Sequence, residues 1–269
     1  MSRRRTATAT AMAFRDQLRR PLVPILLVVV PALIVVWSVA ITKPESRRIE
    51  LSGGVWATTT MKALHGPEMA KFAVAFVAAL VGVFVMRASL QGDRRLVVAG
   101  LRASEAVAAR LLVLLAATTV AVVVSVIAIA LNFSPRSWSP VVAALVLTGL
   151  IYGGIGALVG VLLDKLAATY AILFLVAADL SVVQTPMFHA SPSRFAPLLP
   201  GFGPTRMMLE GAFAQSFKAG VPLLIALAWV VGLGAAAYLV LRRALGAAKP
   251  VPISVRSAIP HQGILKEGR

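Results

Sequence analysis

One acidic residue, Asp179, lies inside a long apolar run, in the segment LFLVAADLSVVQTP. An ionised carboxylate is costly within a membrane, so it is expected to face a cavity, a partner or the interior of a helix bundle. One interpretation makes Asp179 a transport-path or proton-relay group, together with the nearby Gln184. The alternative is that the apolar segment ends early, because Pro186 follows, and that Asp179 lies at the water boundary.

Other patterns that carry chemistry are absent from the sequence. A P-loop needs a Gly-Lys pair to hold phosphates, and the chain contains none. It has no HExxH zinc motif, no GxSxG nucleophile elbow and no Cys. His189 lies close to Ser191 and Ser193, but in this proline-rich loop an interfacial histidine is a better interpretation than a nucleophile–base set. We therefore expect neither an enzyme nor a bound metal or cofactor.

A charged stretch, residues 86–112, separates two apolar runs. Its charged residues are Arg87, Asp93, Arg94, Arg95, Arg102, Glu105 and Arg110. We predict a short helix over residues 92–99, with Leu96 on its apolar side, that Gly100 ends. Ser104 is expected to cap the next helix, with Glu105 in its first turn. This order suits a surface that binds a partner, whereas a loop that only orients the chain in a membrane needs the charges alone.

The elements that must position these residues are helices that cross a membrane. Hydrophobic residues make up 59% of the 269-residue chain and charged residues only 14%, unlike a soluble domain. A helix needs about 20 apolar residues to cross a bilayer core. The predicted fold is an all-α integral membrane protein with six transmembrane helices. They are expected over residues 21–42, 67–86, 108–132, 138–163, 166–186 and 219–241, with Lys71 extending to the interface.

The basic residues orient the chain. The net charge is +17, but Lys and Arg cluster at the ends of apolar runs, which disfavours nucleic acid as a partner. Two thirds of the 27 Lys and Arg residues lie on the side of the N-terminus, so both termini are predicted to be cytoplasmic. We predict a tail and interfacial helix over residues 1–20, a six-span domain over 21–243 and a disordered cytoplasmic tail over 244–269. The first apolar run is too long for a cleaved signal peptide.

Glycine and proline define two further features. The fourth predicted span carries Gly149, Gly153, Gly156 and Gly160, a spacing that lets another backbone approach closely. Residues 43–70 are expected to form a modest outer loop. Residues 187–218 contain four prolines among Phe and Leu residues, and are too apolar for a solvated loop. We predict an outer re-entrant segment there, before the last span, in which Thr205 caps a short helix that ends at Phe217.

Two stretches carry a resemblance to a known family. GDRRLVVAGLRASEAVAARLL (92–112) has a polar start, leucine-like residues, a glycine, a serine and then an Ala/Leu-rich span. LLPGFGPTRMMLEGAF (198–213) is a proline-rich segment ahead of the last span. Over residues 7–243, this order of elements resembles the membrane subunits, or permeases, of ABC transporters of the type-2 export class. Asp93 stands where that family often has a Glu.

The resemblance implies a permease subunit in the plasma membrane that exports a drug, lipid or glycolipid. Residues 91–103 would couple it to a separate P-loop ATPase, which would bind ATP and Mg²⁺. A second permease, identical or closely related, would complete a dimer around the path in the lipid bilayer. The residues expected at the ATPase-coupling interface are Asp93, Arg94, Arg95, Leu96, Gly100, Arg102 and Glu105.

Three other functions fit a multi-pass membrane protein. An ion- or proton-coupled secondary transporter would use Asp179, but such proteins usually carry several intramembrane acids or an inverted repeat. An intramembrane enzyme would need a catalytic set that this sequence lacks. A scaffold or immunity-type membrane protein would need no chemistry at all.

Overall fold

The computed structural model describes residues 22–98 and 102–246, and most of the chain is helical. The predicted interfacial helix, Gly100 and nearly all of the C-terminal tail lie outside the described residues. The elements, in chain order, are α2 (Leu22–Ile41), β1 (Ser46–Glu50), η1 (Ser52–Gly54), β2 (Trp56–Thr60), α3 (Met61–Val98), α4 (Ala103–Ala130), α5 (Trp138–Leu162), α6 (Lys165–Val176), η2 (Ala177–Val183), η3 (Ala196–Leu198), α7 (Phe202–Phe213) and α8 (Gly220–Gly246).

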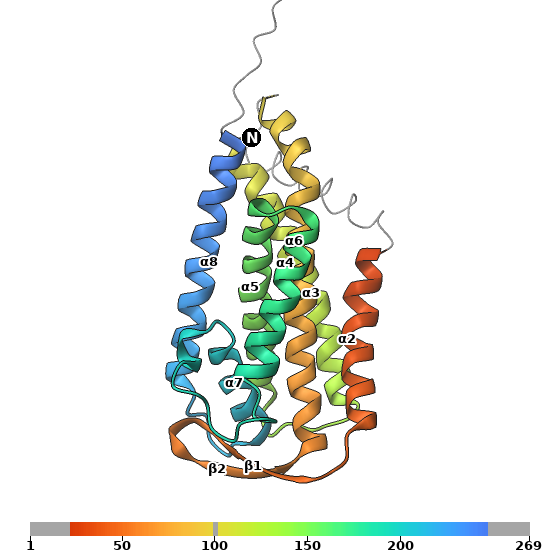
Figure 1. The fold of residues 1–269 in the computed structure, drawn as a ribbon, viewed down its shortest axis with the longest axis vertical. Helices are drawn as coiled ribbons and strands as arrows, with labels where there is room; N and C mark the ends of the chain where they lie inside the picture. The colour runs from red at the N-terminus through yellow and green to blue at the C-terminus, as the bar shows by residue number, and fades with distance from the viewer. Residues whose placement is uncertain (1–21, 99–101, 247–269) are drawn as a thin grey trace, which may run out of the picture.

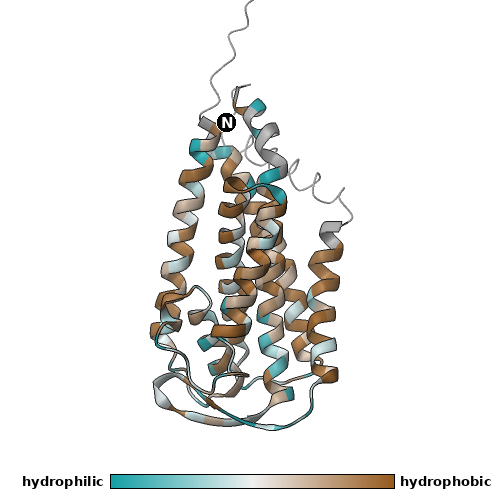
Figure 2. Ribbon diagram, viewed as in Figure 1, coloured by the Kyte–Doolittle hydropathy of each residue, from teal (hydrophilic) through white to brown (hydrophobic). Residues whose placement is uncertain are grey.

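Within the described ranges, five helices are long and apolar enough to cross a membrane, which confirms a helical fold with helices of membrane-spanning length. They are Met61–Arg87, Ser104–Ala130, Trp138–Leu162, Lys165–Val183 and Gly220–Leu245. A further apolar helix, Ile25–Ile41, is shorter. The helices run side by side along the long axis, and hydrophobic residues cover most of their length (Figures 1 and 2).

Helix α3 is the central helix, since it packs against α2, α4, α5 and α6. Its closest neighbour is α5, where glycines remove the side chains that would separate the two backbones. A Cβ at Gly156 would lie 2.0 Å from the backbone oxygen of Ala79, and one at Gly82 would lie 2.6 Å from that of Gly153. Small residues at such a crossing let helices pack closely in a membrane.

Residues 43–70 are predicted to form a loop, but in the structure they contain an antiparallel hairpin and the first part of α3. Strands β1 and β2 pair from Ser46 opposite Thr60 to Glu50 opposite Trp56. Gly53 and Gly54 adopt positive φ angles of 74° and 73°, which glycine tolerates, and so let the chain turn. Helix α3 starts at Met61 rather than near Pro67, and the Thr60 hydroxyl accepts a hydrogen bond from the backbone N–H of Ala63.

Residues 92–98 of the predicted separate helix 92–99 are instead the last part of α3, which runs unbroken from Met61 to Val98. Gly92 is the weakest helix former in this stretch, but its cost of about 1 kcal/mol relative to alanine does not end a long helix. Ser104 does not precede the next helix as predicted. Arg102 holds that position, and its backbone N–H donates to Glu105 Oε2 at 3.3 Å.

The two ends of the bundle differ. The hairpin and α7 lie together at one end, which we call the hairpin end. The α5–α6 connection lies toward the opposite end, which we call the turn end, and α3 extends past this connection (Figure 1). The hairpin packs on α7 through a small apolar cluster that includes Ile49, Leu51, Leu64 and Leu209. Helix α7 also packs against α5 and α8.

Candidate functional site

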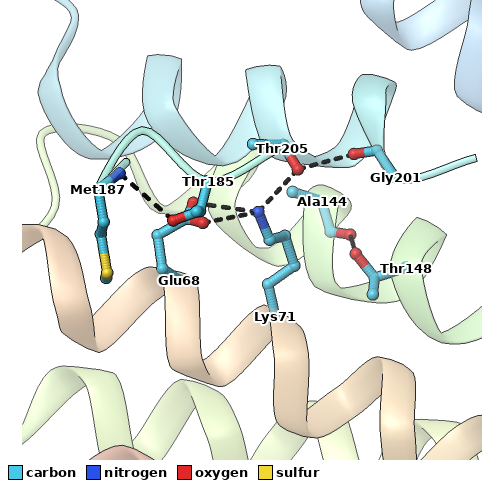
Figure 3. Close-up of polar contacts among 8 residues, drawn as sticks. All are labelled: Glu68, Lys71, Ala144, Thr148, Thr185, Met187, Gly201 and Thr205. Atoms are coloured by element: carbon cyan, nitrogen blue, oxygen red, sulfur yellow. Dashed lines mark hydrogen bonds and ion pairs between the residues drawn. The ribbon is translucent and has the colours of Figure 1, made fainter. Parts of the chain in front are cut away.

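A fully buried ion pair lies on α3 near the hairpin end. Lys71 Nζ donates to both carboxylate oxygens of Glu68, at 2.9 and 3.1 Å, and the exposed fractions of these two side chains are 0% and 1%. The predicted extension of Lys71 to the interface is therefore wrong. The reason is that α7 and the segment before it cover this face of α3, so the ammonium group finds its partners inside the protein (Figure 3).

Two threonines from outside α3 complete the surroundings of this ion pair. Lys71 Nζ donates to Thr205 Oγ1, in α7, at 2.7 Å, and the side chain of Thr185 hydrogen-bonds Glu68. The Thr205 hydroxyl in turn donates to the backbone oxygen of Gly201 at 2.7 Å. Thr205 therefore lies in the first part of α7 and binds Lys71, rather than capping a helix that ends at Phe217 as predicted.

Asp179 is buried, with an exposed fraction of 4%, in the π-helical segment η2. Its Oδ2 atom accepts a hydrogen bond from the Tyr152 hydroxyl at 2.5 Å and another from the backbone N–H of Gly201 at 2.9 Å. Its Oδ1 atom is buried and has no hydrogen-bond partner. The protein thus covers Asp179, and a negative charge there lies next to the start of α7, where helix dipoles favour it.

Gly201 joins the two parts of the site. Its N–H donates to Asp179 and its carbonyl accepts from Thr205, so one continuous hydrogen-bonded network runs from Tyr152 on α5 to Glu68 on α3. A side chain at position 201 would not fit, because a Cβ would lie 2.5 Å from Leu180 and 2.9 Å from the Tyr152 hydroxyl oxygen. We call this set the α7 network; its members are Glu68, Lys71, Tyr152, Asp179, Thr185, Gly201 and Thr205.

Gln184, predicted with Asp179 as a transport-path residue, is also buried but serves the connection before α7. Its side-chain amide donates to the backbone oxygen of Ala196 at 3.1 Å, and its backbone N–H donates to the Asp179 carbonyl at 2.9 Å. The structure therefore brings Asp179 and Gln184 into one segment. The Gln184 side chain holds the proline-rich chain over this part of the bundle.

Two further charged residues of α7 bind the hairpin. Glu210 accepts hydrogen bonds from the backbone N–H groups of Ser52 and Lys218, each at 2.9 Å. Arg206 donates to the backbone oxygen of Glu50 at 2.6 Å. Burial lowers the pKa of the Arg206 guanidinium, and the opposite effect of the neighbouring glutamates is smaller. Charged side chains of α7 thus attach it to the hairpin, while the Thr205 hydroxyl and the Gly201 N–H attach its first part to α3 and to η2.

The predicted coupling residues lie at the turn end. Arg110 of α4 binds Asp93 of α3 with two hydrogen bonds, at 2.8 and 3.0 Å, and both residues are largely buried. Glu105 is buried and bonds back to the start of α4, while Arg95 and Arg102 are exposed. The side chains of Arg94 and Leu96, like the whole of Gly100, lie outside what the structure describes.

The four glycines singled out on α5 face two helices. A Cβ at Gly156 or Gly160 would meet the backbone of α3, at 2.0 Å and 2.8 Å. A Cβ at Gly149 would lie 2.2 Å from the Thr118 side chain of α4, and one at Gly153 would lie 3.3 Å from Leu114. All four positions therefore lie at helix–helix contacts inside this chain.

Most members of the α7 network were not predicted from the sequence. Glu68 and Lys71 are three residues apart on α3, just before the apolar run 72–86, and this spacing is typical of an intrahelical ion pair. Tyr152 gave no such signal, since a tyrosine in an apolar span is unremarkable. No group of three or more His, Cys, Asp or Glu in the described part of the chain is arranged to hold a metal ion.

The chain is mostly helical and has several apolar helices long enough to cross a membrane, which indicates a multi-pass membrane protein. No protein-family model, curated protein or solved structure matches it at a significant level.

Proposed function

We propose that the chain is the permease subunit of an ATP-driven exporter of the type-2 ABC class. In this proposal six helices, α2 included, cross the plasma membrane, and η3 and α7 form a re-entrant segment on the outer side. Both termini lie in the cytoplasm. A separate P-loop ATPase docks at the turn end, and a second permease completes a path for an amphipathic drug, lipid or glycolipid.

The observation that carries the proposal is the length of α3, together with the ion pair that fixes its C-terminal part to α4. Thirty-eight residues correspond to about 57 Å of helix, whereas a bilayer core is about 30 Å thick. The part beyond Arg87 therefore extends out of the apolar region, and it carries Asp93 and Arg95. The two bonds between Asp93 and Arg110 fix this extension against α4, as a docking element requires.

The same helix connects the turn end to the α7 network. Asp93 and Lys71 lie on one continuous helix, about 33 Å apart along its axis. A displacement of the turn end by an ATPase would therefore act directly on the bonds between Lys71, Glu68 and Thr205, and through them on α7. Coupling of this kind needs a rigid element with two positions, and events at either site must shift the equilibrium between them.

The first experiment is purification of the tagged full-length chain from its native membrane, followed by reconstitution and measurement of ATP-driven export. We expect a P-loop ATPase to co-purify and export to require it. The substitutions Arg94→Glu and Arg95→Glu together should reduce ATPase binding and ATP-dependent export at least tenfold, with unchanged membrane insertion.

The matched control reverses two exposed charges at the hairpin end, Lys43→Glu and Lys62→Glu. This control should retain ATPase binding and export. A functional assembly that exports without any P-loop ATPase would contradict the proposal, as would full ATPase binding by the turn-end double variant.

One observation supports a second function, ion- or proton-coupled transport through Asp179. The carboxylate is buried, and its Oδ1 atom lacks a hydrogen-bond partner, as expected of a group that exchanges a proton or ion. Transport driven by an ion gradient alone, and abolished in Asp179→Asn, would favour this function over the ATP-driven one.

A further inference from the structure

A cavity of about 450 Å³ lies at the hairpin end, apart from the α7 network and from the turn end. Its walls come from the hairpin, from the connection before α5, from the end of α7 and from the segment between α7 and α8. This volume is in the range of sites that hold small molecules. The lining residues that matter for recognition are Ser52, Trp56, Arg136, Glu210, Phe213 and Lys218.

The charge of this cavity is positive. Arg136 and Lys218 are both exposed, and neither forms an ion pair with another of the described residues. The lining carboxylate is Glu210, and both of its oxygens already accept backbone N–H groups, from Ser52 and from Lys218. The negative charge of Glu210 also faces the guanidinium of Arg206. Two cationic side chains thus remain available to an anion.

One wall of the cavity is apolar. Trp56 and Phe213 line it together with Leu51 and Val55, and Trp56 is 43% exposed. The guanidinium of Arg48 lies 4.8 Å from the centre of the Trp56 ring, which adds a third cation beside this wall. An aromatic surface next to cations is suited to a ligand with an apolar part and an anionic group.

Ser52 provides a further polar contact. Its backbone N–H binds Glu210, but its hydroxyl oxygen is buried and has no hydrogen-bond partner. Buried hydroxyl groups without partners are uncommon in folded proteins, because leaving one unsatisfied is costly. A ligand oxygen in the cavity would accept the hydrogen bond of this hydroxyl once the Ser52 side chain rotates toward the cavity.

We infer that this cavity binds an amphipathic phosphate monoester, with the phosphate between Arg136 and Lys218 and the apolar part against Trp56 and Phe213. A phosphate dianion balances both cations, whereas a carboxylate would balance one. The planar guanidinium of Arg136 matches two phosphate oxygens, and Lys218 adds a point charge. The ligand is either a lipid with this headgroup or a soluble phosphate ester, and the site is independent of the proposed ATPase partner.

The test is isothermal titration of the full-length protein in nanodiscs made of uncharged lipid. Hexyl phosphate is expected to bind saturably, and inorganic phosphate and hexanoate to bind at least tenfold more weakly. Dihexanoyl phosphatidic acid distinguishes the source, because tighter binding than hexyl phosphate identifies a lipid headgroup and weaker binding identifies a soluble ester. Arg136→Gln and Lys218→Gln should each weaken hexyl phosphate binding about tenfold.

The control is Lys43→Gln, which removes an exposed cation at the same end outside the cavity and should leave binding unchanged. Because Arg136 and Lys218 are exposed, their replacement should preserve the fold, which size-exclusion chromatography checks. An equal loss in Lys43→Gln would show only general attraction to a basic surface and would overturn the inference. So would the absence of saturable binding, or equal binding of inorganic phosphate or hexanoate.

Discussion

Lys71 and Thr205 are 134 residues apart in the chain, yet Lys71 Nζ donates a hydrogen bond to Thr205 Oγ1 at 2.7 Å. This contact attaches α7 to the central helix α3 and places a charged group, without exposure to solvent, in the interior of the bundle (Figure 3). The charge is tolerated because Glu68 neutralises it from the same helix. The consequences of removing either partner can be predicted.

Lys71→Ala is expected to lower the free energy of unfolding by about 3–5 kcal/mol, because it leaves the Glu68 carboxylate buried and unpaired. The double substitution Glu68→Gln with Lys71→Met removes both charges and should recover most of that loss. Chemical denaturation in detergent measures both variants. Lys62→Ala, at an exposed position of the same helix, is the control and should change stability by at most about 0.5 kcal/mol. A double variant as unstable as Lys71→Ala would contradict this account.

Gly201→Ala is expected to displace the start of α7, since the added methyl group would lie 2.5 Å from Leu180 and 2.9 Å from the Tyr152 oxygen. Overpacking of this kind costs about 1–3 kcal/mol. Thermal unfolding of the purified variant gives the size of the effect. Gly220→Ala is the control, because a Cβ there meets nothing within 4 Å. Equal unfolding midpoints for the two variants would show that the chain accommodates a side chain at position 201.

Gly156→Ala should separate α3 from α5, because a Cβ would lie 2.0 Å from the Ala79 oxygen and neither backbone can move freely. We expect a loss of at least about 1–3 kcal/mol, with a lower yield of folded protein. The matched substitution on α8, Gly234→Ala, places its Cβ in open space and should be tolerated. Fluorescence-detected size-exclusion chromatography after heating compares the two. Tolerance of Gly156→Ala would argue against the close helix crossing.

Asp179→Asn is expected to weaken the hydrogen bonds from Tyr152 and Gly201, and to lower stability by about 1.5–3 kcal/mol, the usual worth of bonds to a charged group. Tyr152→Phe removes one of these bonds while keeping the carboxylate, so it serves as the comparison. Export assays with and without a pH gradient separate two roles. If the role is structural, both variants lose export in proportion to stability. Loss of export in a stable Asp179→Asn protein alone would assign the carboxylate to the transport path.

The sequence predicted the helical class of the fold well, because an apolar run of sufficient length is a local property. It predicted the boundaries less well. Met61 begins α3 because the hairpin before it ends at Thr60, and a hairpin over residues 46–60 depends on packing against α7. The charges of residues 86–112 were visible, but the pairing of Asp93 with Arg110 depends on how α3 and α4 meet.

The amino-acid sequence by itself determined that the chain is mostly helical, that several of its apolar helices are long enough to cross a membrane, and which residues carry charge among them. Each depends on residues near one another in the chain. Only the tertiary structure decided that Lys71 is buried, that Asp179 faces Tyr152, and that Gly201 joins the two. These contacts connect α3, α5, η2 and α7, and the choice among possible polar partners is made by packing. A buried charge is stable only where the folded structure places a partner next to it.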